Sequence, residues 1–556
     1  MRVRLALAIA TVACLGAPAV AGAGEPIMKL ADVRSDMSCT ALSVLRGTAV
    51  SRFDIEVIDV LRGEAAAYGP RILFRASGPA IDATGIGPGF SGSPIYCRDD
   101  AGVERVAGAI SEGIGQYGNK VALATPIEEV LGVRALPPPR ARTASALLRS
   151  ARPLSTPLTV GGLSGPVRRA AVTAARRAGT PLLAAPAGPA TGHAPYELAP
   201  GTSVAAGLSS GDITISAIGT VTYRDGDRLW AFGHPLDGYG RRALPLLDAY
   251  VFTIVDNPLG TFEGMTYKLA SAGRPVGILT NDGIGAIAGR IGTPPPTIPL
   301  VISAHDLASG RRRTLRARVA DERRLDRPTG LGLAGMFGLG EAMTSVLGAE
   351  PPNLAASMCV RAHVRQAPRP LRFCKRYFSQ WGMIGDLSTA LGLLDGYRFG
   401  PLGIRRVAVR TQLRAGARDA FIVRGKAPRR VEPDQRIRVR LRLQRSRAGR
   451  FGVSFPYRVP RSAKPGRRTL TVRGTGPGDG GGLLQLFQLL FGVSGDSPSR
   501  SPRSIGELAT RFAHLGRPDG VRATLAPKGA GRIVYRTKSV RIRGRTQIPL
   551  IVRRDR

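Results

Sequence analysis

The feature that most constrains this chain is a glycine-dense turn that closes on a serine. It runs Thr84-Gly85-Ile86-Gly87-Pro88-Gly89-Phe90-Ser91-Gly92-Ser93, and the apolar run Pro94-Ile95-Tyr96 follows at once. Glycines in such a turn allow positive φ angles and let the backbone approach another group closely. The ordinary interpretation is a tight turn between two strands, in which the hydroxyl groups bond the local backbone.

The spacing of Gly89 and Ser91 supports a second interpretation of the same turn. In serine peptidases of the chymotrypsin type, the nucleophile and a glycine two places before it present backbone N–H groups to the developing oxyanion. Gly89 and Ser91 have this spacing. If the turn is catalytic, Ser91 is the nucleophile and the amides of Gly89 and Ser91 are the oxyanion donors.

Composition and periodicity predict a mainly β fold with several domains. The 556 residues exceed the size at which a single core stops growing, about 250 to 300 residues. The 71 glycines and 43 prolines indicate many turns and short strands rather than helical arrays. Apolar and charged residues alternate along 53–60 and 436–443, and 213–223 with 228–232 forms a hairpin pattern around Asp225-Gly226.

We divide the chain into a signal peptide and five further parts. Arg2 and Arg4 precede an apolar run and a small-residue cleavage site, so residues 1–23 are predicted to be a signal peptide. The other parts are the serine-motif part (24–133), a Pro/Ala/Arg-rich linker (134–195), a histidine-bearing part (196–304), a mixed region with a cysteine pair (305–425) and a basic C-terminal β domain resembling a sandwich (426–556). We therefore expect an exported protein, extracellular or in the cell envelope, with no membrane span in the mature chain.

The cysteines outside the predicted signal peptide fall into two separated sets. In an oxidising compartment the natural pairs are Cys39 with Cys97 and Cys359 with Cys374, although four cysteines allow three connectivities. Their spacing resembles no zinc site, and we expect neither a metal nor another cofactor.

The formal net charge of +41 suggests an anionic partner. The arginines are spread along the chain and are not interleaved with aromatic residues, and no nucleic-acid-binding motif accompanies them. Nucleic acid is therefore not expected as a partner, whereas an anionic cell-wall polymer is a candidate.

The serine turn resembles the hallmark of the SpoIVB serine peptidase family, which is family 55 of the serine peptidases and belongs to the chymotrypsin-like clan. That hallmark is Gly-Met-Ser-Gly-Ser-Pro-Ile/Val, and the stretch 89–95 matches it with Phe90 in place of Met. The downstream Thr125-Pro126-Ile127-Glu128 also resembles the long exported bacterial members. The resemblance implies a chymotrypsin-like β-barrel region, Ser91 as nucleophile, and a protein or peptide substrate.

His234 is the second residue of interest. A lone histidine at the end of a strand is usually structural. However, Gly233-His234-Pro235, followed by the glycine-rich stretch 280–289, resembles the histidine-bearing part of the same family, which implies that His234 is the general base. In the sporulation peptidase the histidine precedes the serine, whereas here it follows, so we expect a rearranged order of segments.

The third member of a catalytic triad is left open. Asp237, three residues after His234, is one candidate, and Asp82 and Asp282 are the others. An aspartate in this role must reach Nδ1 of the histidine.

Two functions from different classes follow. The first is an exported serine endopeptidase that acts through an acyl-enzyme, including the case of a regulatory peptidase that cleaves only itself or one partner. The second is a non-catalytic envelope-binding protein built on a degenerate peptidase fold, with its basic C-terminal domain gripping an anionic polymer.

Overall fold

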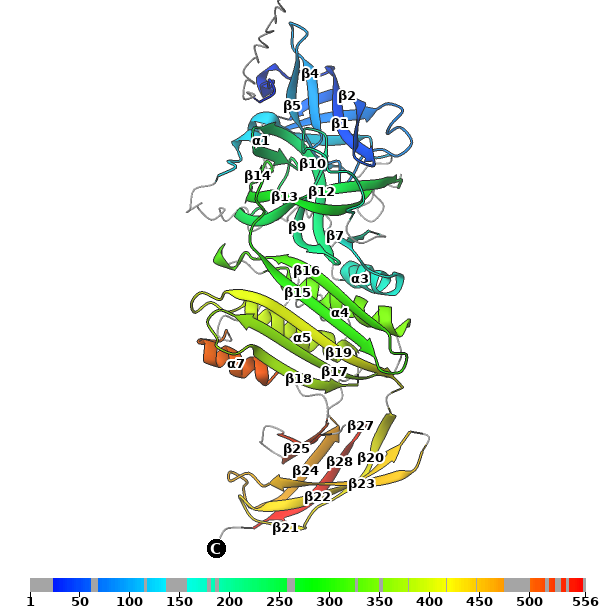
Figure 1. Cartoon of the computed structure of the whole chain (residues 1–556), viewed down its shortest axis with the longest axis vertical. Helices are drawn as coiled ribbons and strands as arrows, with labels where there is room; N and C mark the ends of the chain where they lie inside the picture. The colour runs from blue at the N-terminus through cyan, green and yellow to red at the C-terminus, as the bar shows by residue number, and fades with distance from the viewer. Residues whose placement is uncertain are drawn as a thin grey trace, which may run out of the picture.

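The computed structural model describes residues 24–61, 69–114, 118–136, 158–177, 182–185, 190–257, 266–325, 329–349, 354–378, 380–416, 418–446, 448–474, 501–515, 520–525, 532–536 and 540–553. The predicted signal peptide, 1–23, lies outside these residues. The described chain is mainly β, as the composition indicated. Figure 1 shows three bodies stacked along the longest axis of the molecule.

The first six strands form a closed antiparallel barrel, which we name the serine barrel. They pair in the order β1-β2-β3-β6-β5-β4. Residues with buried side chains alternate with exposed acids along the second strand, as the sequence pattern predicted. The elements of this part are η1 (Leu30–Asp32), β1 (Ser38–Arg46), β2 (Ala49–Leu61), β3 (Arg71–Ser77), β4 (Pro94–Arg98), β5 (Glu104–Gly113), β6 (Val121–Pro126) and α1 (Ile127–Gly132).

A second set of six strands closes in the same way, and we name it the histidine ring. These strands belong to a 13-stranded sheet in the order β18-β17-β19-β15-β16-β9-β12-β13-β14-β11-β10-β7-β8, but an additional β9–β10 pairing joins the two ends of β9-β12-β13-β14-β11-β10. If the strands of each set are numbered one to six along the chain, both sets pair in the same circular order, 1-2-3-6-5-4. The strands are β9 (Ser203–Gly211), β10 (Thr214–Asp225), β11 (Arg228–Ala231), β12 (Gly240–Val255), β13 (Tyr267–Asp282) and β14 (Ile287–Ile291).

Part of the segment 134–195 is not the linker that we predicted. It contributes β7 (Leu158–Gly161), α3 (Gly165–Arg177) and β8 (Leu182–Ala184), and β7 pairs with β10 along four residues. Ala171 and Ala175 of α3 are buried in the main apolar cluster. Small side chains in an Ala/Arg-rich stretch are therefore used to pack one helix face, which its composition did not reveal.

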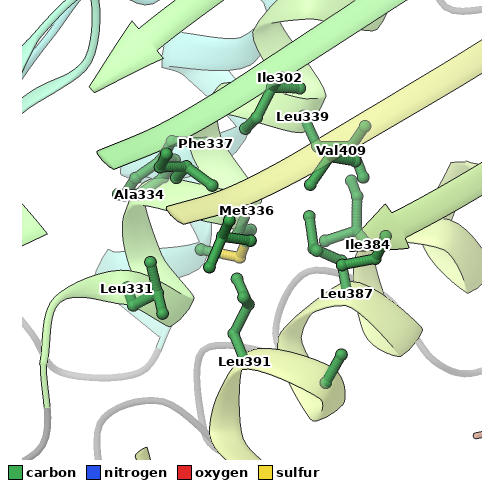
Figure 2. Packing of buried hydrophobic residues seen from close by; sticks show 14 of the residues in the cluster. Ile302, Leu331, Ala334, Met336, Phe337, Leu339, Ile384, Leu387, Leu391 and Val409 are labelled. Carbon is green, nitrogen blue, oxygen red and sulfur yellow. The ribbon is translucent and has the colours of Figure 1, made fainter. Parts of the chain in front are cut away.

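The middle body continues the large sheet across the boundary predicted at residue 304. It contains β15 (Thr297–Asp306), β16 (Arg312–Ala320), η3 (Arg323–Leu325), α4 (Leu331–Leu347), β17 (Leu354–Val364), β18 (Leu371–Tyr377), α5 (Gln380–Asp395) and β19 (Ile404–Ala415). Figure 2 shows Met336 and Leu339 of α4 and Leu387 of α5 gathered against Ile302 and Val409 of the sheet. One apolar layer between helices and sheet therefore holds this body together.

Helix α7 (Ile505–Ala513) belongs to the middle body, although we assigned its residues to the C-terminal domain. Phe512 of this helix is buried against Phe373 of β18, with ring centroids 5.5 Å apart. Ser504 caps its first turn by accepting a hydrogen bond from Glu507 N. Figure 1 shows the helix beside β18.

The C-terminal body consists of two sheets that share one apolar cluster. The four-stranded sheet has the order β23-β22-β20-β27, and the five-stranded sheet has the order β21-β28-β24-β25-β26. The body begins with β20, eight residues before the boundary predicted at 426. Its strands are β20 (Arg418–Lys426), β21 (Arg430–Val431), β22 (Arg436–Arg445), β23 (Arg450–Arg458), β24 (Gly466–Gly474), β25 (Gly520–Leu525), β26 (Arg532–Arg536), β27 (Val540–Arg543) and β28 (Arg545–Val552).

Both disulfide pairs suggested by the sequence are formed. Cys39 in β1 lies directly opposite Cys97 in β4, and Cys359 in β17 lies opposite Cys374 in β18. These bonds are compatible with an exported protein. Within the described residues, none of the helices has the length and apolar character needed to cross a membrane.

Candidate active site between the serine barrel and the histidine ring

The serine turn joins β3 to β4 and packs closely against the histidine ring. Gly92 has a φ of 90°, and a Cβ at this position would lie 2.0 Å from Thr220 O and 2.4 Å from Phe232 N. Only glycine permits this approach. Phe90, fully buried, anchors the turn to its own barrel through an edge contact with Phe53, with ring centroids 6.2 Å apart.

The turn leaves an unusual set of polar groups without partners. The N–H groups of Phe90, Gly92 and Ser93 donate to Gly87 O, Ile110 O and Phe90 O. Among the described residues, those of Gly89 and Ser91 donate to no acceptor. The Ser91 hydroxyl also has no partner, although the residue is only 7% exposed. Because buried polar groups are nearly always hydrogen-bonded, two such amides beside one such hydroxyl call for a functional explanation.

Two threonines of β10 fix the turn from the other side of the contact. Thr220 N donates to Ser91 O at 2.8 Å, and its hydroxyl donates to Gly89 O at 3.0 Å. The hydroxyl of Thr222 donates to Gly92 O at 2.8 Å. These bonds use the carbonyl groups of the turn and leave its amides free.

His234 follows β11, so it occupies the connection between the third and fourth strands of its ring, as Ser91 does in the serine barrel. The preceding Phe232 has a φ of 73°, which is strained for a bulky residue, and Gly233 has a φ of 66°. Gly233 lies close to Ile110 O, because a Cβ built on it would be 3.0 Å from that atom. Gly92 N donates to the same oxygen. The serine and histidine connections therefore meet at one carbonyl group of β5.

The hydrogen bond of the imidazole selects one tautomer. His234 Nδ1 lies 2.7 Å from Pro235 O, and because a carbonyl only accepts, Nδ1 carries the proton and Nε2 has a free lone pair. Burial lowers the pKa of His234, which keeps the ring neutral near pH 7. Since Ser91 Oγ has no partner, no hydrogen bond joins the two side chains in this structure.

The three aspartates considered for the third position all have other partners. Asp282, fully buried, accepts hydrogen bonds from the N–H groups of Leu236 and Asp237, at 2.7 and 2.9 Å. Asp237 pairs with Arg242 at 2.9 Å. Asp82 is exposed and pairs with Lys120 on the serine barrel. None of them bonds to His234, but Asp282 fixes the backbone directly after it.

Two charged residues near His234 were not expected from the sequence. Glu112 of β5 raises the pKa of His234 and Arg71 of β3 lowers it, although burial has the larger effect. Arg71 and Glu112 form a largely buried ion pair, with 3.1 Å between Arg71 Nη2 and Glu112 Oε1. Their positions 41 residues apart give no local signal, and only the pairing of the barrel strands brings them together.

Lys268 is the most informative residue that sequence reasoning missed. Its ammonium group is buried behind the serine turn, where it donates to Ser43 Oγ at 2.7 Å and Thr220 Oγ1 at 3.2 Å and lies 4.8 Å from the Phe90 ring centroid. Ser43 Oγ in turn lies 2.8 Å from Ser93 Oγ. Among the described residues no carboxylate pairs with Lys268, and burial lowers its pKa to about 7. A lone buried lysine inside a strand offers no motif by which it could have been found.

Comparison with known proteins adds no family to this picture. No family model matches the chain, and no curated protein matches it significantly in sequence.

Proposed function

We propose that the protein is an exported serine endopeptidase, related to the SpoIVB family and built on a chymotrypsin-like pair of barrels. The observation that carries this proposal is the set of unpaired groups at the serine turn. The N–H groups of Gly89 and Ser91 and the hydroxyl of Ser91 are the donors and the nucleophile that an acyl transfer needs, and all three lack partners in the free protein. A purely structural turn gains nothing by leaving them unpaired.

The strand order supports the same function. In trypsin-like enzymes the strands that follow the nucleophile turn lead into a short helix, and here the serine turn is followed by the three strands β4, β5 and β6 and then by the short helix α1. The histidine ring repeats the circuit and carries His234 at the equivalent connection. On this proposal the two barrels occur in reversed order along the chain, and the site forms where they meet. The two C-terminal sheets are then a separate sandwich.

The proposed chemistry begins with attack by Ser91 Oγ on the scissile carbonyl. His234 Nε2 takes the hydroxyl proton and later gives it to the leaving amine, and a water molecule then hydrolyses the acyl-enzyme by the same route. The developing negative charge on the carbonyl oxygen is stabilised by the N–H groups of Gly89 and Ser91. Proton transfer requires Ser91 Oγ and Nε2 to approach to about 2.6 to 3.2 Å, so substrate binding has to bring the side chains together.

Asp282 and Lys268 act in this scheme as positioning residues. Asp282 is the best placed of the three candidate acids, because its carboxylate holds the amides of Leu236 and Asp237 immediately after His234. Lys268 holds Thr220, whose hydroxyl and N–H bind the carbonyls of Gly89 and Ser91. Because Thr220 binds these carbonyls on one side of the turn, Lys268 helps to keep the amides of Gly89 and Ser91 on the other side.

The test is covalent labelling with a fluorophosphonate probe, followed by identification of the modified peptide. The intact protein is expected to be labelled at Ser91, and labelling is expected to vanish in both Ser91→Ala and His234→Ala. Ser93→Ala is the matched control, because it removes a hydroxyl two residues away that is bonded to Ser43 rather than free.

Ser91→Ala is also a clean variant for stability, since the hydroxyl that it removes has no partner to lose. Its denaturation midpoint should equal that of the wild type. If the folded wild type is not labelled, or if labelling survives in Ser91→Ala, the peptidase proposal is wrong and the non-catalytic binding protein is favoured.

A further inference from the structure

The outer surface of the four-stranded C-terminal sheet carries a row of unpaired cations. Every second residue of β22 has a buried side chain in the apolar cluster, and the residues between them are exposed arginines. Two cations of the neighbouring β20 lie directly opposite two of these arginines. We name this surface the arginine face, and it consists of Arg436, Arg438, Arg440 and Arg442 of β22 with Arg424 and Lys426 of β20.

The arginine face is electrostatically unfavourable in the free protein. The pairs Arg424/Arg442 and Lys426/Arg440 place like charges directly across neighbouring strands, an arrangement that destabilises a sheet. Among the described residues, none of the six side chains makes an ion pair or a hydrogen bond. Other arginines of this body do find acids, since Arg458 pairs with Asp434 and Arg541 with Asp419.

The arginine face is extended along its strand. Alternate residues of a strand are about 6.6 to 6.8 Å apart, so the four arginines of β22 span roughly 20 Å in one line. On the β23 side Arg442, Arg440 and Arg438 face residues that are exposed and carry no charge, namely Gly452, Ser454 and Pro456, and Arg436 faces another arginine, Arg458. None of these four β23 residues offers the guanidinium groups an acidic partner.

Exposed apolar side chains lie at one end of the same face. Phe421 of β20 is 43% exposed and lies opposite Gln444, one step along the sheet from the Arg424/Arg442 pair. Val423, at the irregularity between these positions, is 52% exposed. Cations around an exposed aromatic and an exposed aliphatic side chain form an amphipathic surface, not a purely ionic one.

We propose that the arginine face docks the protein onto an anionic phospholipid bilayer. The charged groups lie against lipid phosphates, and Phe421 with Val423 enters the region between headgroups and acyl chains. A soluble polyanion would satisfy the cations but would give no reason for the two exposed apolar residues. A bilayer accounts for both the cations and the exposed apolar side chains. The docking does not depend on the peptidase proposal.

The test is sedimentation of the full chain with vesicles of phosphatidylcholine, with and without phosphatidylglycerol. The wild type is expected to bind only the vesicles that contain phosphatidylglycerol, less so as salt increases. Each cation near an anionic bilayer contributes about fivefold in partition, so Arg438→Gln/Arg440→Gln should weaken binding by about 25-fold. Phe421→Ser should weaken it by about tenfold and reduce the part that resists salt.

The matched control is Arg316→Gln/Arg318→Gln. It makes the same charge change at two exposed positions of β16, in the middle body, and should leave partition within about twofold. Equal loss in the two double variants would show that overall charge, not the arginine face, drives binding. Equal binding to both kinds of vesicle would also overturn the proposal. So would retention on soluble polyphosphate or DNA together with vesicle binding that Phe421→Ser leaves unchanged, because the face would then bind a polyanion.

Discussion

The serine barrel and the histidine ring share one pairing circuit but treat the connection between their third and fourth strands differently. In the serine barrel the connection is rich in glycine, and its amides and hydroxyl at Gly89 and Ser91 are left unpaired. In the histidine ring the corresponding turn is tightly bonded, because Asp282 accepts from its backbone amides. The comparison shows that the serine barrel leaves polar groups of its connection unpaired, whereas the histidine ring holds the backbone after His234 in place. Each prediction below challenges one part of that division.

The largest effect is expected from Gly92→Ala. The added methyl would lie 2.0 Å from Thr220 O and 2.4 Å from Phe232 N, on a residue with a φ of 90°. Backbone atoms cannot move aside as a flexible side chain does, so the contact between barrel and ring should open. We expect a loss of more than about 3 kcal/mol in the free energy of unfolding, measured in urea, and complete loss of probe labelling.

Gly102→Ala is the control for this prediction. Gly102 lies in the same barrel and also has a positive φ, of 78°, but a Cβ there meets nothing within 4 Å. Only backbone strain remains, which costs about 1 kcal/mol. If the two variants were equally stable, the close contact at Gly92 would be incorrect.

Lys268→Met is expected to change how stability depends on pH. Burial lowers the pKa of Lys268 to about 7 in the folded protein, from 10.5. Between these values the unfolded chain binds more protons, so this residue makes the free energy of unfolding rise with pH from about 7 toward 10, by up to about 1.4 kcal/mol per pH unit. The variant should lose that rise and be more stable than the wild type at acidic pH.

Urea denaturation at a series of pH values measures this slope. Lys120→Met is the control, because Lys120 is only half-buried and pairs with Asp82. It should leave the slope between pH 7 and 9 unchanged. A wild-type slope that persists in Lys268→Met would mean that the lysine is charged in the folded protein and paired.

Much of the serine half could be predicted from the sequence because its signals are local. The alternation in β2, the glycines of the turn and the match at residues 89–95 lie within short windows, and each concerns backbone conformation or one buried face. Cys39 and Cys97 were paired from compartment and spacing alone. The sequence therefore located the turn in which the unpaired Ser91 hydroxyl lies.

The groups that complete the site could not be predicted, since they depend on which distant strands pair. Thr220 and Lys268 lie more than a hundred residues from Ser91, and the sequences of their strands, β10 and β13, do not show which strands they pair with. The same reason explains the errors in the domain boundaries. Neither the pairing of β7 with β10 nor the packing of α7 on β18 is encoded within its own segment.

Asp282→Asn is expected to weaken the histidine connection. The amide side chain can keep one of the bonds to Leu236 N and Asp237 N but loses the charge that faces Arg242 at 3.5 Å. Burial raises the pKa of Asp282, and Arg242 keeps Glu322 as its main partner. We therefore expect a loss of about 2 kcal/mol in stability and a fall in the labelling rate of Ser91 of about tenfold or more.

Asp237→Asn tests whether the effect of Asp282→Asn comes from a lost charge beside Arg242 or from the lost hydrogen bonds to the backbone after His234. Asp237 also pairs with Arg242, but its side chain is about half exposed, so its loss should cost less than about 1 kcal/mol. Its labelling rate should match that of the wild type. If Asp237→Asn slowed labelling more than Asp282→Asn, Asp237 would be the acid that supports His234.

Apart from the control variants, the smallest effect is expected from Thr222→Val, which tests whether the ring holds the serine turn through side chains. The hydroxyl of Thr222 is buried and donates to Gly92 O, and valine keeps its shape while removing that bond. The cost should be about 1 to 2 kcal/mol in urea denaturation, with labelling of Ser91 retained, because Thr220 still bonds Ser91 O and Gly89 O. Thr214→Val, at a buried position of the same strand where it meets β7, is the control. Loss of labelling in Thr222→Val at unchanged stability would mean that this one hydroxyl determines the conformation of the serine turn. The unpaired amides of Gly89 and Ser91 would then depend on side chains of the histidine ring more than on the glycines of the serine barrel.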